Sequence, residues 1–191
     1  GSSMVEVNSY SFPRMWVGNV NYVAAPTWTV EFFLMTVNIG NDTVSLYNPT
    51  IESKNGLLRL TLLSPSLLPN LYVNGTWTTS STPIPYGQWV HLALVFDGSA
   101  YKLYTDGALN FSVSSSINLW TDLQNICLLG SIQNANVYQS GFIDSVRVST
   151  TARYSGTYTV PVTPWTSDSY TISLNNFDTT ADQVVDLGQI D

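Results

Sequence analysis

The stretch Gly87-Gln-Trp-Val-His-Leu-Ala-Leu-Val-Phe-Asp-Gly-Ser-Ala-Tyr-Lys-Leu-Tyr-Thr-Asp-Gly107 decides the fold. Residues 89–96 are largely apolar on both faces of an extended strand, which predicts a central, buried strand. Asp97-Gly98 then predicts a tight turn, and residues 101–105 return as a second strand that ends at Asp106-Gly107. The stretch therefore predicts a β-meander, completed by residues 108–114, in which Leu109, Phe111 and Val113 share one face.

Strand patterns also flank this meander. Residues 29–36 and 56–63 are rich in β-branched, aromatic or alternating apolar residues, and Pro65 and Pro69 are expected to close the second strand. Asn74-Gly75 between residues 71–73 and 76–78 predicts a hairpin with a type I′ turn. Trp77 in this hairpin could be a ligand platform, although cross-strand packing is the commoner role of such an aromatic residue.

Composition restricts the class of protein. The 191 residues are enough for one well-buried core and short for two, so one domain is predicted. Charged residues make up 10% and aromatic residues 13% of the chain, which is typical of all-β proteins with uncharged polar surfaces. The formal net charge of -7 argues against a nucleic-acid partner, since phosphate binding depends on Lys and Arg. No apolar run is long enough for membrane insertion.

Two blocks of sequence resemble a known family. The first is Trp89-Val90-His91-Leu92-Ala93 with the two Asp-Gly turns, preceded by Trp28-Thr29-Val30-Glu31-Phe32-Phe33. The second is Gly141-x-Ile-Asp-x-x-Arg147, followed by Ala152-Arg-Tyr154 and a closing Pro161. Together they are similar to the laminin-G-like (pentraxin-like) branch of the concanavalin A-like lectin/glucanase superfamily, in the form found in tailed-phage virion and tail proteins.

The resemblance covers roughly residues 10–178 and implies an all-β fold. We expect a two-sheet antiparallel β-sandwich of jelly-roll type. The expected organisation is a cloning remnant at residues 1–3, one laminin-G-like domain at 4–178, and a C-terminal tail or attachment strand at 179–191.

Glycoside hydrolysis is disfavoured, although the superfamily also contains glucanases. Those enzymes resemble one another in a Glu-x-Asp-x-(x)-Glu strand that places two carboxyl groups about 5 Å apart. Glu6, Glu31 and Glu52 are the three glutamates of this chain, and none has that neighbourhood. His91, the single histidine, is interpreted as a packed or hydrogen-bonded strand residue rather than a member of a catalytic triad. The chain is therefore predicted not to be an enzyme.

A carbohydrate site requires a flat aromatic ring for stacking and polar groups for the sugar hydroxyls. Trp120, expected to be exposed in a polar loop, meets this requirement on paper together with its polar neighbours Asp122 and Asn125. Asn136 and Tyr138 lie in a following polar segment. These five residues form the predicted ligand-binding site.

Calcium is the one metal ion that the sequence leaves as a candidate. With one His and one Cys127, a structural zinc site of the usual ligand set is excluded, and Cys127 is interpreted as a buried core residue. The resemblance allows Ca2+ near a loop cluster, and the candidate oxygen ligands belong to polar segments. They are Asp42, Asp122 and Asp178, with Asn41, Asn125 and Asn176 nearby. No Asp-rich spacing motif supports the ion, so no cofactor is predicted. Asp97 and Asp106 are interpreted as turn residues, and Asp144 and Arg147 as members of a buried polar network.

Two functions follow from the resemblance. The first is a non-enzymatic carbohydrate-binding or adhesion domain of a viral, phage-type virion or tail protein, with a surface glycan or polysaccharide as partner. The second is a structural capsid-decoration or virion-assembly protein with a lectin-like fold and no glycan binding. Both imply localisation in the virion, contacts with other virion proteins, and a homo-oligomer as one option.

Overall fold

Strand β8 (Trp89–Phe96) is the central strand that its apolar pattern predicts. It pairs antiparallel with β3 (Trp28–Thr36) on one side and with β9 (Ala100–Thr105) on the other. The side chains of β8 are buried from Val90 to Phe96. The computed structural model describes residues 5–7, 15–18, 25–36, 48–63, 65–128, 141–162 and 164–177.

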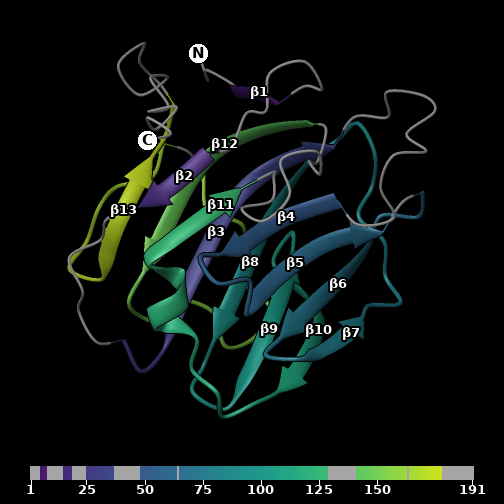
Figure 1. The fold of residues 1–191 in the computed structure, drawn as a ribbon. Helices are drawn as coiled ribbons and strands as arrows, with labels where there is room; N and C mark the ends of the chain where they lie inside the picture. The colour runs from purple at the N-terminus through teal and green to yellow at the C-terminus, as the bar shows by residue number, and fades with distance from the viewer. Residues whose placement is uncertain are drawn as a thin grey trace, which may run out of the picture.

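The sheet that contains β8 has seven strands within these described residues, in the order β1-β12-β3-β8-β9-β10, with β13 also beside β12 (Figure 1). Its other strands are β1 (Val5–Val7), β10 (Ala108–Ser114), β12 (Gly141–Ser149) and β13 (Thr171–Asn175). Strand β1 pairs with the first residues of β12 and β13 with its last ones. Strand β12 begins at a glycine because a Cβ at Gly141 would collide with the carbonyl oxygen of Met35.

The second sheet has six strands in the described part of the chain, in the order β2-β11-β4-β5-β6-β7. These are β2 (Met15–Gly18), β11 (Asn125–Leu128), β4 (Asn48–Ser53), β5 (Leu58–Leu63), β6 (Leu68–Val73) and β7 (Thr76–Thr79). Neighbouring strands are antiparallel throughout both sheets. The expected all-β antiparallel sandwich is therefore confirmed.

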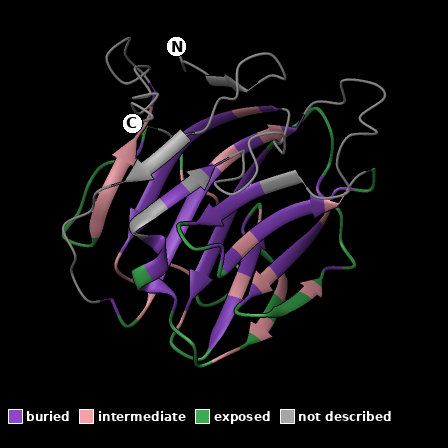
Figure 2. Cartoon of the chain, viewed as in Figure 1, coloured by how far each residue is buried: buried purple, intermediate pink, exposed green. Residues whose placement is uncertain are grey.

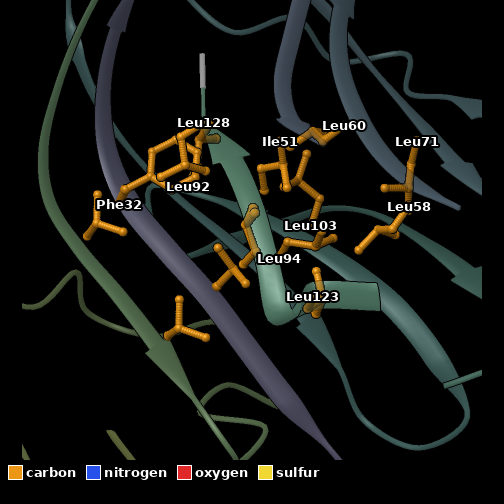
Figure 3. Close-up of a cluster of buried hydrophobic side chains, with 14 of the residues drawn as sticks. Phe32, Ile51, Leu58, Leu60, Leu71, Leu92, Leu94, Leu103, Leu123 and Leu128 are labelled. Carbon is orange, nitrogen blue, oxygen red and sulfur yellow. The ribbon is translucent and has the colours of Figure 1, made fainter. Parts of the chain in front are cut away.

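The core lies between the two sheets. Figure 3 shows Phe32, Leu92 and Leu94 of the seven-stranded sheet facing Ile51 and leucines of the six-stranded sheet. The strand period of two sends alternate side chains to opposite faces, so Leu58, Leu60 and Leu62 enter this core while their neighbours point outward. Burial of these apolar side chains is the main stabilising term of the fold.

The predicted turn residues have the backbone that the turns require. Asn74 and Gly75 have φ of 40° and 102°, and Asp106 and Gly107 have φ of 47° and 79°, which is the left-handed pattern of type I′ hairpins. Asp97 accepts hydrogen bonds from the backbone N–H groups of Ser99 and Ala100, each at 2.8 Å. The interpretation of Asp97 and Asp106 as turn residues is confirmed.

Three local expectations are wrong. Pro69 does not close a strand but lies inside β6, paired with Leu62, where its carbonyl oxygen accepts from the Ser80 N–H. Leu109 does not share the inward face of Phe111, because the β9–β10 register shifts between them, and Leu109 is 48% exposed. The segment around Trp120 is a 3-10 helix, η1 (Trp120–Gln124), rather than a loop. The described segments contain no helix with the length and hydropathy that a membrane crossing requires.

Candidate functional site

The predicted aromatic platform at Trp120 is not exposed. Its side chain belongs to the hydrophobic core and is 6% exposed. Helix η1 turns this ring inward, and the Trp120 N–H donates to Asn118 Oδ1 at 3.0 Å, which fixes the start of the helix. The exposure expected for Trp120 is therefore wrong, because the sequence alone did not reveal the short helix.

Asp122 is buried and has a structural set of partners. Its carboxylate accepts from the Ser53 hydroxyl, from the Asn55 N–H at 3.0 Å and from the Leu57 N–H at 3.2 Å. The side chain thus closes the turn between β4 and β5 by accepting from backbone and side-chain donors of that turn.

The structure does not describe where the other predicted site residues lie relative to Trp120 and Asp122. Asn125 opens β11, but its side chain lies outside the described residues, and Asn136 and Tyr138 lie outside them entirely. Within the described chain, the structure brings together Trp120 and Asp122 alone, on one short helix that faces inward.

A different surface has the features expected of a ligand site: the outward face of the six-stranded sheet. The strand registers place Glu52 of β4 opposite Arg59 of β5, Arg59 opposite Tyr72 of β6, and Tyr72 opposite Trp77 of β7. These four residues form one line across four strands, and we call it the aromatic row. The residues on either side of Arg59 and Tyr72 belong to the hydrophobic core, as does Ile51 before Glu52, so the aromatic row points away from the other sheet.

The aromatic row is ordered by contacts between its members. Arg59 Nε lies 2.9 Å from Glu52 Oε1, and the Arg59 guanidinium lies over the Tyr72 ring at 5.7 Å from its centroid. The Tyr72 and Trp77 ring centroids are 4.9 Å apart, with the planes inclined at 49°. The ion pair therefore holds Tyr72 on one side while Trp77 holds it on the other.

Trp77 is the accessible end of the aromatic row. Its side chain is 41% exposed, whereas the Glu52 side chain at the other end is 2% exposed. Figure 2 shows exposed and intermediate positions on β7, β6 and β5, in the sheet that faces the viewer. An exposed indole in a fixed orientation offers a flat apolar face at low conformational cost.

Polar side chains lie two residues away from the aromatic row along the same strands. Thr61, Asn70 and Thr79 occupy registered positions on β5, β6 and β7 and share the outward face with the aromatic row. The Thr79 hydroxyl donates to Asn70 Oδ1 at 3.0 Å, and the Thr61 hydroxyl donates to the Asn70 carbonyl oxygen at 3.3 Å. Thr79 is exposed, so its hydroxyl oxygen can accept a further hydrogen bond beside the Trp77 ring.

The sequence contained a signal for this surface. The Asn74-Gly75 turn fixes the register of the hairpin, so Tyr72 and Trp77 had to lie opposite each other. The cross-strand packing weighed for Trp77 is confirmed, and the ring is nevertheless substantially exposed. The pairing of Arg59 with both Glu52 and Tyr72 depends on β4, a strand that the sequence pattern had not identified, and on the register of β6 against β5.

The outward face of the seven-stranded sheet carries a second polar cluster, which we call the buried network. Glu31 is 0% exposed and its Oε1 accepts from Arg147 Nε at 2.8 Å. Its Oε2 accepts from the Tyr154 hydroxyl at 2.6 Å and lies 3.2 Å from His91 Nε2. The Arg147 guanidinium lies over the Trp165 ring, 4.7 Å from the centroid. The predicted roles of Arg147 in a polar network and of His91 as a hydrogen-bonded strand residue are confirmed.

A segment after β12 covers this network. Tyr154 and Tyr158 stack with centroids 3.5 Å apart, and the Tyr158 hydroxyl lies 3.0 Å from His91 Nδ1. The Tyr158 N–H donates to the Gly107 carbonyl oxygen, and a Cβ at Gly107 would collide with the Tyr158 carbonyl. The glycine of the second Asp-Gly turn is thus what allows this segment to lie against the sheet.

A second arginine, Arg153, holds the beginning of the covering segment, just before Tyr154. Arg153 donates from its two terminal nitrogens to the two carboxylate oxygens of Asp168, at 2.9 and 2.8 Å. This bidentate bond lowers the pKa of Asp168 well below its usual range. Asp144, the other residue predicted for the network, is buried at 8% exposure and accepts from the Ser145 hydroxyl at 3.4 Å.

The Glu31–His91–Tyr158 chain has the connectivity of an acid–base–hydroxyl triad but lacks its properties. A carboxylate only accepts, so in the neutral imidazole Nε2–H donates to Glu31 and Nδ1 accepts from the Tyr158 hydroxyl. Burial, followed by the negative charges of nearby groups, raises the pKa of Tyr158 far above its usual range. A phenol held protonated is a poor nucleophile, and His91 is 0% exposed. The arrangement stabilises the sheet face.

The described residues hold no group of three or more His, Cys, Asp or Glu side chains that could bind a metal ion. Of the calcium candidates, Asp122 is occupied by the β4–β5 turn, and the Asn176 side chain bonds to the backbone of Trp165. Asn41, Asp42 and Asp178 lie outside the described residues, as does the side chain of Asn125.

Comparisons with solved structures agree with the fold. A candidate carbohydrate-binding protein from Bacteroides ovatus aligns with a TM-score of 0.56 and 17% identity, over 74% of this chain and 42% of that one. A heptameric pentraxin from Limulus polyphemus gives 0.54 and 14%, over 79% and 76%. The CBM40 module of a Ruminococcus gnavus sialidase, bound to α2,3-sialyllactose, gives 0.51 and 14%, over 69% and 79%. This chain thus spans less than half of the Bacteroides protein.

Sequence comparison gives the family. No curated protein matches the chain. Residues 17–157, well over half of the sequence, match a laminin G model whose description is the concanavalin A-like lectin/glucanases superfamily. The strands on which the family resemblance rested, β3, β8 and β12, fall within that match. The chain belongs to the concanavalin A-like lectin/glucanase superfamily.

Proposed function

We propose that this chain is a non-enzymatic carbohydrate-binding domain whose ligand lies on the aromatic row. The observation that carries the proposal is Trp77, 41% exposed and oriented by its contact with Tyr72, beside a Glu52–Arg59 pair. A pyranose has a C–H face that stacks on such a ring and hydroxyls that need donors and acceptors at its rim. The partly exposed Arg59 supplies donors, and the hydroxyl oxygen of the exposed Thr79 supplies an acceptor.

Two of the similar structures support this function. One is described as a candidate carbohydrate-binding protein, and the other is a carbohydrate-binding module with a bound oligosaccharide. The binding role also fits the absence of a Glu-x-Asp-x-(x)-Glu strand from the sequence, which favours recognition over glycoside hydrolysis.

We place this binding domain in the virion or tail of a phage, where it would attach the particle to a surface glycan. The support is the resemblance of Gly141–Arg147 and Ala152–Tyr154 to the laminin-G-like domains of such proteins. In this setting the domain would also contact other virion proteins and could be repeated in a homo-oligomer.

The test is a screen of the purified protein against arrayed bacterial and algal polysaccharides, followed by calorimetry with each hit. Trp89→Ala is the matched control for Trp77→Ala, because Trp89 is 39% exposed but lies on the other sheet. Base–aromatic and comparable stacking contributes about 1–3 kcal/mol, so Trp77→Ala should weaken binding about fivefold or more. Trp89→Ala should leave the affinity within about twofold.

Two results would count against the proposal. Equal losses in both variants would remove the aromatic row as the site. If the folded wild-type protein bound no polysaccharide on the array, the result would favour the alternative function, a structural capsid-decoration or virion-assembly protein that binds no glycan. Light scattering of the same sample would then show whether the protein self-associates, as virion components usually do.

A further inference from the structure

We infer that the ligand of the aromatic row is an uncharged glycan and that the Glu52–Arg59 ion pair excludes acidic ones. This inference rests on the proposed function and names the class of its ligand. Many surface polysaccharides carry carboxylate or sulfate groups, so charge is a property by which a binding domain discriminates.

The first support is that the arginine of the aromatic row is already ion-paired. Arg59 Nε lies 2.9 Å from Glu52 Oε1. The Glu52 side chain is 2% exposed and cannot swing into water to release its partner, while the Arg59 side chain is 30% exposed. An anionic sugar brought to Arg59 would therefore meet a guanidinium already neutralised, with a fixed carboxylate behind it.

The second support is that three of the four other described cations are engaged in the same way. Lys102 pairs with Asp97 at 2.6 Å, Arg147 with Glu31 at 2.8 Å, and Arg153 with Asp168 at 2.8 Å. Lys54 is exposed at the β4–β5 turn, where solvent screens its charge. The whole sequence carries a net charge of -7, which repels polyanions at long range.

The third support is that the same groups suit hydroxyls. The Arg59 side chain is 30% exposed, and its guanidinium carries several N–H donors from which a sugar hydroxyl oxygen can accept. The exposed Thr79, two residues along β7 from Trp77, adds a hydroxyl oxygen that can accept from a sugar hydroxyl. A neutral sugar gains these bonds without displacing Glu52 from Arg59.

The experiment compares uncharged and acidic oligosaccharides on the full chain by calorimetry, in 50 and 500 mM NaCl. The uncharged probes are cello-, manno- and xylo-hexaose and methyl-esterified oligogalacturonate, and the acidic probes are oligogalacturonate and chondroitin sulfate oligosaccharides. We expect an uncharged probe to bind with less than a twofold change in Kd between the two salts. Acidic probes should bind at least tenfold more weakly.

Tighter binding of an acidic probe, weakened by salt, would overturn the inference while leaving the proposed function standing. Failure of every probe to bind would overturn the proposed function, and the inference with it. The two failures are therefore distinguishable in one data set.

Glu52→Gln tests the cause, because it releases Arg59 with little change in volume. We expect this variant to bind oligogalacturonate at least fivefold more tightly than the wild type, with a new salt dependence. Asp97→Asn is the matched control, since it changes the net charge equally but frees Lys102 of β9, on the other sheet. An equal gain in both variants would assign the effect to net charge and overturn the role of the ion pair. The wild-type salt comparison remains decisive if Glu52→Gln does not fold.

Discussion

The two sheets of this domain carry nearly the same set of groups on their outward faces. Glu31 pairs with Arg147, whose guanidinium lies 4.7 Å from the Trp165 centroid. Glu52 pairs with Arg59, whose guanidinium lies 5.7 Å from the Tyr72 centroid. Each face thus has a glutamate, an arginine and an aromatic ring in contact.

The two faces differ in what covers them. Residues after β12 lie over the first set, where Tyr154 and Tyr158 complete the hydrogen bonds of Glu31 and His91. The second set ends in Trp77, which is 41% exposed. Coulombic attraction is stronger where water is excluded, and an unpaired charge is then more costly. The covered set therefore stabilises the fold, while Arg59, Tyr72 and Trp77 of the second, open set remain partly exposed at the surface.

The largest expected effect comes from breaking the covered set. Glu31→Gln leaves Arg147 buried without its counter-charge, so the free energy of unfolding should fall by about 3–5 kcal/mol. Glu52→Gln is the matched variant on the open set, and its cost should be about 1 kcal/mol because Arg59 is partly solvated. Urea denaturation of both variants at pH 7 measures the difference.

Equal losses in the two variants would contradict the comparison, since they would mean that cover does not distinguish the two ion pairs. A loss below about 1 kcal/mol in Glu31→Gln would show that the buried network contributes no more than a surface pair.

The second prediction uses pH to sharpen the same contrast. Burial raises the pKa of Glu31, but the hydrogen bonds from His91, Arg147 and Tyr154 outweigh it and lower the pKa below its usual 4.5. A carboxyl group with a lowered pKa in the folded state stabilises the fold above its unfolded pKa and loses that contribution as the pH falls through the folded pKa. The stability gap between wild type and Glu31→Gln should be constant from about pH 7 to 5 and narrow below 4.5.

Urea denaturation at intervals of half a pH unit measures this gap. A gap that widens on acidification would mean that the Glu31 pKa is raised in the folded protein, contrary to the hydrogen bonds that surround it.

A smaller effect is expected from Tyr154→Phe. Its hydroxyl donates to the Glu31 carboxylate at 2.6 Å, a hydrogen bond to a charged group. Losing such a bond costs about 1.5–3 kcal/mol, and thermal or urea unfolding measures it. Tyr170→Phe is the control, since Tyr170 is 53% exposed and its loss should stay within about 0.5 kcal/mol. Similar values for the two variants would show that the hydroxyl contributes no stability to the network.

Most of the fold could be predicted from local patterns. The strand at residues 89–96, its two Asp-Gly turns and the Asn74-Gly75 hairpin follow from strand periodicity and turn chemistry. Pro69 and Leu109 were misassigned for physical reasons. A proline is tolerated in a strand where no acceptor on a neighbouring strand needs its missing N–H, and a bulge at Asn110 reverses the side-chain alternation.

The candidate site was less predictable because it depends on contacts between distant strands. Trp120 was expected in an exposed loop, but a 3-10 helix of five residues buries it, and such a helix has a weak sequence signal. Trp77 and Tyr72 could be paired from the hairpin, whereas the approach of Arg59 and Glu52 required the register of β4, β5 and β6. Sequence patterns predict the register of two paired strands only where a short turn joins them.

The smallest effect on stability is expected where the largest effect on binding is expected. Trp77→Ala removes an exposed ring from an edge strand, so the free energy of unfolding should change by less than about 1 kcal/mol. Trp165→Ala is its counterpart on the covered face, where the ring is 5% exposed and lies under Arg147, and should cost about 3 kcal/mol or more. If Trp77→Ala were as destabilising as Trp165→Ala, its ring would be serving the fold, and its loss of glycan binding would no longer identify a site. A stable Trp77→Ala protein that has lost the glycan makes the open face a binding surface, because an exposed aromatic side chain that contributes little to folding has its energetic role in recognition.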